Sequence, residues 1–196
     1  MNVVKSDKSQ RLVVGISGAS GVIYGIRLLE LLQDTPIETH LVITDSAVVT
    51  LAHETQYKLE YVKSLASTCH SNRDIGAAIS SGSFRTMGMV IAPCSICSMS
   101  EIAVGTTSSL LARAADVVLK ERRRLVLMVR ETPLHTNHLR NMTALSEVGA
   151  IIAPPVPAFY AKPEILDDIV NHSLGRILDL FDIELGIVRR WRELSQ

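Results

Sequence analysis

Short apolar runs rich in β-branched residues alternate along this chain with longer segments of helical periodicity. The runs lie at 11–16, 38–44, 88–92, 125–129 and 150–153, and the helical patterns lie at about 22–32, after Ser46, at 110–120, at 138–148 and at about 163–180. Such alternation is typical of a parallel sheet with helical crossover connections. The sequence therefore predicts an α/β domain of about five mostly parallel strands flanked by helices.

Length and composition favour one domain. The chain has 196 residues with 47% hydrophobic content, enough for one core. We expect a flexible N-terminal segment at 1–10 and a single domain at 11–196 with a C-terminal helix and tail. Only 68–85 lacks clear periodicity, and we interpret it as an ordered excursion beside a site.

Charge and cysteine usage narrow the partners and the compartment. Twenty basic residues balance twenty acidic ones, so no nucleic-acid or membrane partner is expected. No apolar run approaches the ~18 residues of a membrane span, and three cysteines do not suggest a disulfide framework. We expect a cytoplasmic protein with free thiols.

A glycine-rich turn follows the first apolar run and opens a helix. Gly15, Gly18 and Gly21 recur every third residue, with Ser17 where the dinucleotide fingerprint would have its second glycine. Backbone N–H groups and the helix dipole converge on anions at such a turn. The spacing favours the phosphate of a mononucleotide, although a turn that only packs the helix on the sheet is the alternative. After the second run, Asp45 could contact a ribose or cap the next helix.

A second turn, at 93–98, follows the third apolar run and should face the same crevice. Its Cys94 and Cys97 have the spacing of a redox dithiol or of half a metal site. No second such pair completes a zinc site, so we favour contacts of Ser95, Ser98 and free N–H groups with the ligand.

Cations surround the fourth apolar run. Arg122 to Arg124 are interpreted as a solvated helix end, whereas Arg130 and Glu131 leave the carboxyl end of the strand. There Arg130 could meet a phosphate and Glu131 could act as an acid or base. His135 and His138 lack an acidic third ligand, so no catalytic metal is predicted, and Trp191 either caps an interface or contacts ligand.

Taken together, six sequence blocks closely resemble the UbiX-like flavin prenyltransferase family, whose members were formerly named phenylacrylic or aromatic acid decarboxylases. The blocks are Gly15-x-Ser-Gly-Ala-Ser-Gly, Ile-Ser-Ser-Gly-Ser-Phe at 79–84, Pro93-Cys94-Ser95, the 112–122 segment, Arg130-Glu131-Thr-Pro-Leu and Pro154 to Tyr160. The resemblance runs from about Arg11 to Trp191. It implies a three-layer flavodoxin-like, FMN-binding domain in a homododecamer with the active site where subunits meet. The implied reaction moves a dimethylallyl group from dimethylallyl monophosphate to reduced FMN, giving prenylated FMN for a UbiD-type decarboxylase.

The resemblance also implies roles for individual residues. FMN contacts would come from the two turns, the end of the second strand and one helix: Gly18, Ala19, Ser20, Thr44, Ser95, Ile96, Cys97, Ser98 and Arg113. Prenyl-phosphate contacts would come from Lys120, Arg130, Tyr160 and Arg176, which could stabilise a leaving phosphate without a metal. Catalytic roles fall to Ser20, Glu54 and Glu131, the glutamates as proton-transfer groups.

One segment departs from the family pattern. Many relatives read Cys-Ser-Met-Lys-Thr after the proline, whereas this chain has Ile96, Cys97 and Ser98 at the last three positions, without the lysine. Alternative functions are a non-catalytic FMN carrier for an aromatic acid decarboxylase system, direct decarboxylation of aromatic acids and a nicotinamide oxidoreductase. A cysteine decarboxylase is disfavoured because Pro133 to His138 lack that group's Pro-x-Met-Asn-x-x-Met-Trp segment.

Overall fold

Six parallel strands form one sheet in the order β3-β2-β1-β4-β5-β6 in the computed structural model, which describes residues 10–192. The strands are β1 (Arg11–Ile16), β2 (Glu38–Ile43), β3 (Thr68–Ser71), β4 (Gly88–Cys94), β5 (Arg124–Val129) and β6 (Ala150–Ile152). After β3 the chain crosses β1 to begin β4, so a topological switch point lies between β1 and β4. The predicted α/β class is confirmed; of the predicted N-terminal segment, residues 1–9 lie outside the described part.

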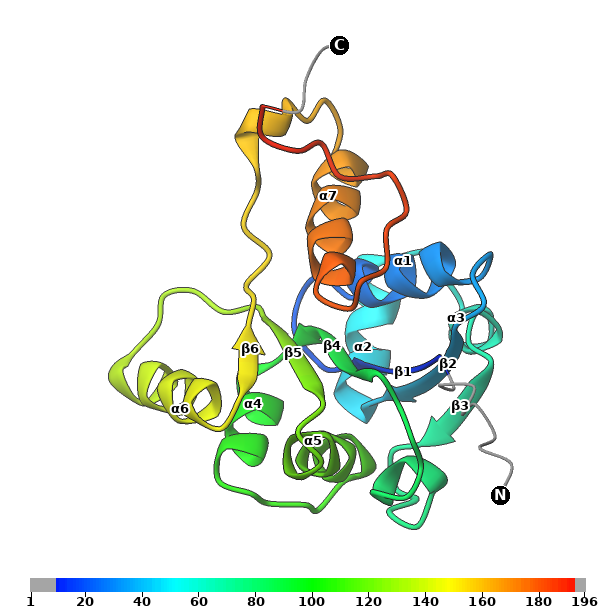
Figure 1. Cartoon of the computed structure of the whole chain (residues 1–196), viewed down its shortest axis with the longest axis vertical. Helices are drawn as coiled ribbons and strands as arrows, with labels where there is room; N and C mark the ends of the chain where they lie inside the picture. The colour runs from blue at the N-terminus through cyan, green and yellow to red at the C-terminus, as the bar shows by residue number, and fades with distance from the viewer. Residues whose placement is uncertain (1–9, 193–196) are drawn as a thin grey trace, which may run out of the picture.

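Helices cover both faces of the sheet (Figure 1). One face packs against α1 (Ile23–Leu32), α2 (Asp45–Glu54), α3 (Leu59–Ser64) and α7 (Leu166–Asp179), and the other against α4 (Ile96–Ala103), α5 (Leu110–Lys120) and α6 (Thr136–Glu147). Side chains of β1 alternate between the two cores, with Val14 in the first and Val13 in the second. No helix within residues 10–192 combines the length and apolarity needed to cross a bilayer.

β3, α3 and α7 differ from the sequence prediction, which placed no helix at α3. β3 is a sixth strand inside the stretch interpreted as an excursion, and it was missed because this edge strand has only partly buried and exposed side chains and no apolar run. α7 begins at Leu166 rather than at Pro163. Asp168 explains this start, because its carboxylate accepts the N–H groups of Glu164 and Ile165.

Arg123 corrects the interpretation of 122–124 as a solvated helix end. Its guanidinium donates to the carbonyl oxygens of Phe84 and Gly82, both at 2.7 Å. Arg124 is half exposed and pairs with Asp182 at 3.2 Å. Arg123 therefore fastens the 82–84 loop against the end of α5.

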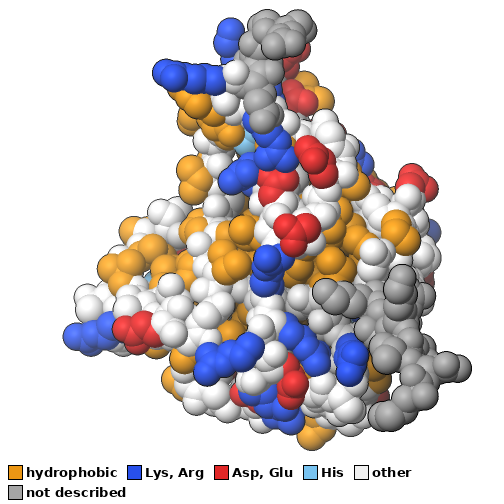
Figure 2. Space-filling model, in the orientation of Figure 1, with side chains coloured by type: hydrophobic (Ala, Val, Ile, Leu, Met, Phe, Trp, Pro, Cys, Tyr) orange, Lys and Arg blue, Asp and Glu red, His pale blue; other side chains and the backbone are white. Residues whose placement is uncertain are grey.

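An arm projects from the sheet on the side of α7. We define the arm as residues 153–192, in which the segment after β6 runs along α7 and the C-terminal segment returns beside them (Figure 1). The arm exposes large apolar side chains that a solvated protrusion would not need: Val156, Phe159, Ile165, Leu166 and Trp191. Figure 2 shows apolar side chains along the arm and on the body beside it.

His40 is buried on β2 with both ring nitrogens in contact with neighbours. Nδ1 lies 3.0 Å from Nε2 of His70, and Nε2 lies 3.0 Å from the Glu38 carboxylate. The Arg11 guanidinium pairs with Glu38 at 2.7 Å. Burial lowers the pKa of His40, and the charge of Glu38 offsets this decrease only in part. Burial also lowers the pKa of His70, despite the nearby charge of Asp74.

The free energy of unfolding is expected to decrease as the pH falls below about 6.5, the ordinary pKa of histidine. Both pKa values are lower in the folded chain, so the unfolded chain binds protons first; stability is complete above the unfolded pKa and is lost below it. Thermal denaturation at neutral and mildly acidic pH measures this slope. A His40→Gln variant should show a smaller slope, and an unchanged slope would contradict the role of His40.

Candidate functional site

The two predicted turns meet at the switch point through the hydroxyl of Ser17. This buried hydroxyl donates to the carbonyl oxygen of Pro93 at 2.9 Å and accepts the N–H of Ser95 at 2.7 Å. The N–H of Ser17 also donates to Pro93 at 3.2 Å. Ser17 therefore joins the two turns, and its hydroxyl is not free to bind a phosphate.

A Ser17→Ala variant is expected to lower the free energy of unfolding by about 1–3 kcal/mol, because the half-buried N–H of Ser95 loses its acceptor. Urea denaturation measures the change. The control is Ser64→Ala at the end of α3, an exposed residue whose hydroxyl donates to the carbonyl oxygen of Tyr61 at 2.7 Å and whose loss should cost less than about 0.5 kcal/mol. Equal effects of the two substitutions would contradict the bridging role.

The first turn leaves backbone donors for an anion. The N–H of Ala19 donates to Ser17 at 2.8 Å, whereas those of Gly18 and Ser20 have no hydrogen-bond acceptor within residues 10–192. A Cβ at Gly18 would collide with the side chain of Ser46, so glycine allows the turn to lie against the start of α2. This geometry suits a phosphate oxygen at the turn.

Glu54, at the end of α2, accepts hydrogen bonds from the next backbone N–H groups of the same turn. Its carboxylate accepts the N–H of Gly21 at 2.8 Å and that of Val22 at 3.3 Å, and the hydroxyl of Ser20 bonds to it as well. Burial raises the pKa of Glu54, but these bonds and the charge of Arg130 outweigh it and lower the pKa. The structure thus brings Ser20, Glu54 and Arg130 together, with Glu54 ionised at neutral pH.

Glu131 follows Arg130 at the exposed carboxyl end of β5. Its carboxylate accepts the N–H of Thr132 at 3.1 Å. Thr44 follows β2 and caps α2, accepting the N–H of Ala47 at 3.1 Å. Asp45 is the exposed first residue of α2 and pairs with Arg73 at 2.9 Å; because Thr44 is the cap, the alternative in which Asp45 caps the helix is wrong.

The second turn opens α4 at Ser95. The Ser95 hydroxyl accepts the N–H of Ser98 at 3.2 Å, while the first N–H groups of the helix, from Ile96 and Cys97, have no acceptor inside it. Cys97 is exposed, whereas Cys94 is buried and burial raises its pKa to about 12. A thiol with that pKa is not a nucleophile at neutral pH, so the dithiol alternative loses its support.

A cavity of about 310 Å³ lies between α7 and the segment after β6. We call it the arm cavity. Its polar lining comes from Tyr160, His172, Ser173 and Arg176, and its apolar lining includes Met128, Pro154 and Val156. It contains no carboxylate, although Arg176 pairs with Asp179 at 2.7 Å. One cation, a phenol and an apolar wall can hold a small apolar phosphate ester.

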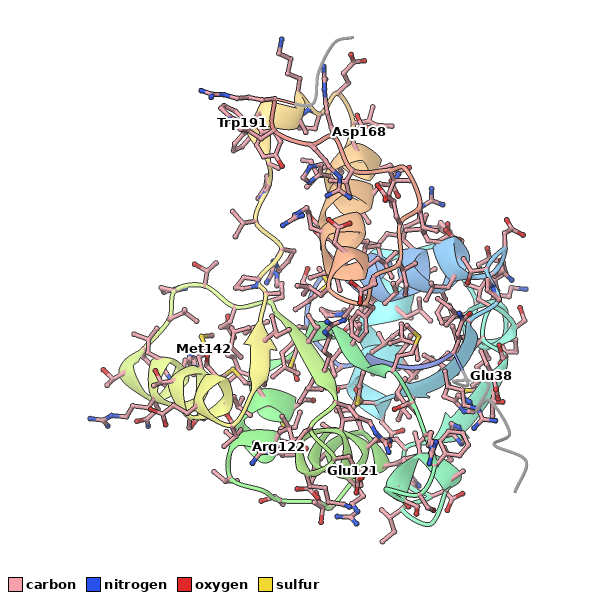
Figure 3. The ribbon with its side chains drawn as sticks, in the orientation of Figure 1. Glu38, Glu121, Arg122, Met142, Asp168 and Trp191 are labelled. Carbon is pink, nitrogen blue, oxygen red and sulfur yellow. The ribbon has the colours of Figure 1, made fainter. Side chains whose placement is uncertain are left out.

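Lys120 and Arg113 lie away from that cavity on α5. Lys120 ends α5 close to the amino end of β5, where it pairs with Glu121 at 2.6 Å. Arg130 follows the carboxyl end of β5, so the six residues of this strand, roughly 20 Å of extended chain, lie between them. Figure 3 places Glu121 and Arg122 at the opposite end of the molecule from Trp191. Arg113 pairs with Asp116 at 2.7 Å.

Residues 10–192 contain no group of three or more His, Cys, Asp or Glu side chains arranged to hold a metal ion. His135 caps α6, accepting the N–H of Asn137 at 3.2 Å, and its ring lies against that of His138 with centroids 3.5 Å apart. His172 is a cavity residue that the sequence reasoning missed, because a histidine inside an expected core helix carries no motif.

The chain matches the Flavoprotein family over residues 2–181. The flavin prenyltransferase UbiX of Thauera aromatica is 56% identical over 191 residues, covering 95% of this chain and 98% of the relative. The crystal structure of AnUbiX (PadA1) in complex with FMN and dimethylallyl pyrophosphate has a TM-score of 0.93 and 46% identity, covering 95% and 99% of the two chains. A dodecameric FMN-dependent UbiX-like decarboxylase from Escherichia coli has a TM-score of 0.91 and 49% identity, covering 93% and 100%.

Proposed function

This chain belongs to the UbiX-like flavin prenyltransferases of the Flavoprotein family, and on that premise we propose that it transfers a dimethylallyl group from dimethylallyl monophosphate to reduced FMN. The prenylated FMN would serve a UbiD-type decarboxylase. The observation that carries the proposal is the arm cavity, which combines the Arg176 and Tyr160 side chains with an apolar wall. A prenyl phosphate has a charged phosphate that suits the polar lining and an apolar prenyl chain that suits the apolar wall.

FMN fits the switch point. The open N–H groups of Gly18 and Ser20 would bind its phosphate, and those of Ile96 and Cys97 lie at the neighbouring helix start. Thr44 would contribute its hydroxyl from the end of β2. Because Ile96 and Cys97 can contribute backbone groups, the missing lysine of the family pattern does not remove these contacts. Reduced FMN supplies the electron-rich ring that accepts the prenyl group.

Phosphate departure would depend on Arg130, Tyr160, Arg176 and Lys120. Charged and hydroxyl donors facing the leaving oxygens stabilise the negative charge that grows as the carbon–oxygen bond breaks. Glu54 would accept a proton, because its lowered pKa keeps it ionised at neutral pH. Glu131 would act beside Arg130 at the end of β5, where its carboxylate is exposed.

Assembly would complete the site. Lys120 and Arg130 lie near opposite ends of β5, so a single chain does not bring them together. We propose a homododecamer in which Lys120 and Arg113 reach the site of a neighbouring copy. The exposed apolar side chains of the arm and the dodecameric state of the Escherichia coli relative support this proposal.

The test is an anaerobic incubation of the purified protein with reduced FMN and dimethylallyl monophosphate, without metal, followed by mass spectrometry of the released flavin. A flavin heavier by one dimethylallyl unit is expected. A parallel incubation with dimethylallyl pyrophosphate, the compound bound by AnUbiX, decides which phosphate ester is the donor. Bound but unmodified FMN with both donors would favour the carrier function, and no FMN binding would overturn the proposal.

A further inference from the structure

His172 lines both the arm cavity and a second cavity of about 510 Å³. Lys162, Asn171 and Arg189 line the second cavity. His172 is only 8% exposed, whereas Tyr160, its neighbour in the arm cavity, is 39% exposed. The two rings meet edge to face with centroids 5.5 Å apart. A buried histidine beside an accessible tyrosine can determine which way the tyrosine hydroxyl points.

The contacts of Nε2 fix the tautomer of His172. This nitrogen lies 3.2 Å from the backbone carbonyl oxygen of Arg189 and 3.3 Å from the hydroxyl of Tyr160. A carbonyl oxygen only accepts, so Nε2 carries a hydrogen, which it shares between the two oxygens. The hydroxyl oxygen of Tyr160 is therefore an acceptor in this contact. Its own proton stays available for an acceptor in the arm cavity.

The C-terminal segment holds the carbonyl of Arg189 in place. The guanidinium of Arg189 donates to the carbonyl oxygen of Ala161 at 3.0 Å. At Gly175 the segment lies directly on α7, since a Cβ there would meet Cγ1 of Ile187 at 3.0 Å. Trp191 packs edge to face on the Tyr160 ring with centroids 5.4 Å apart. Tyr160 is thus held by α7 on one side and by the end of the chain on the other.

We propose that His172 is a positioning residue for prenyl transfer, whose Nε2–H orients the hydroxyl of Tyr160 so that it donates a hydrogen bond to the departing phosphate. The inference rests on the proposed function, because it requires the phosphate in the arm cavity. A donor aimed in advance at an oxygen that gains charge stabilises the transition state more than the ground state. His172 itself does not touch the phosphate.

Two substitutions at His172 test this in the full-length protein with reduced FMN. His172→Leu removes the N–H and should lower kcat/KM for dimethylallyl monophosphate about tenfold, the size of one hydrogen bond to a charged group. His172→Gln keeps an N–H donor and should stay within about twofold of the wild type. In a Tyr160→Phe background, His172→Leu should change kcat/KM by less than about twofold, because the hydroxyl it orients is absent.

A tenfold loss that persists in the Tyr160→Phe background would overturn the proposal, since His172 would then act only by packing. Unchanged kcat/KM in His172→Leu would overturn it as well. A second readout does not depend on turnover: inorganic phosphate should shift the ¹³C resonance of Tyr160 Cζ in the wild type and in His172→Gln but not in His172→Leu. No phosphate shift in the wild type would overturn the positioning role. Absence of prenylated flavin with that shift present would contradict the proposed function alone.

Discussion

A Lys120→Ala variant is expected to lose prenyl transfer by about a thousandfold while it keeps its fold and its bound FMN. Lys120 is half exposed at the end of α5, where its ammonium pairs with Glu121 and lies beside Gly82. Its removal should therefore leave the core intact. Single-turnover rates under anaerobic conditions measure the loss, and Lys58→Ala, on the exposed start of α3, is the matched control.

Mixing two inactive variants tests whether the site spans two chains. Arg130→Ala should also be inactive, and each variant retains the residue that the other lacks. If Lys120 serves a neighbour's site, co-assembly from equal amounts should restore about one quarter of the sites, because each residue is then native with probability one half. No recovery after unfolding and co-refolding, with mixed oligomers verified by mass spectrometry, would place both residues in one chain's site.

The periodicity of the sequence predicted the parts of the fold in which burial is strong. β1, β2, β4 and β5 are buried on both faces and read as apolar runs, so their positions were predicted to within about two residues. β3 was missed because it is an edge strand with exposed side chains and therefore has no such run. Arg123 was misread because a charged residue at a helix end resembles a solvated one.

The site was predictable where it depends on local turns. The glycine spacing predicted the turn that presents the N–H groups of Gly18 and Ser20. The bridge from Ser17 to Ser95 joins residues 78 positions apart and has no local signature. The same holds for His172, whose role depends on the carbonyl of Arg189 rather than on a side-chain pattern. Contacts made through the backbone cannot be predicted from residue identities.

A Glu54→Gln variant is expected to slow prenyl transfer about a hundredfold, the lower range for loss of a general base. The glutamine oxygen can still accept the N–H groups of Gly21 and Val22, so the turn should remain formed and FMN affinity should change less than tenfold. What is lost is the negative charge beside Ser20 and Arg130. Stopped-flow single turnovers at saturating reduced FMN measure the rate.

The pH dependence gives the independent check on Glu54. The pKa of Glu54 in the folded chain lies below its usual value of about 4.5. Above pH 4.5 the carboxylate is therefore ionised and contributes its full stability, and both are lost only as the pH falls through the lower pKa of the folded chain. The wild-type rate should therefore show no loss due to Glu54 between pH 7 and 5. Glu60→Gln on the surface of α3 is the matched control and should leave the rate unchanged. A Glu54→Gln rate equal to that of Glu60→Gln would mean that Glu54 only shapes the turn, and the proton would then have to be taken by Glu131 at the end of β5.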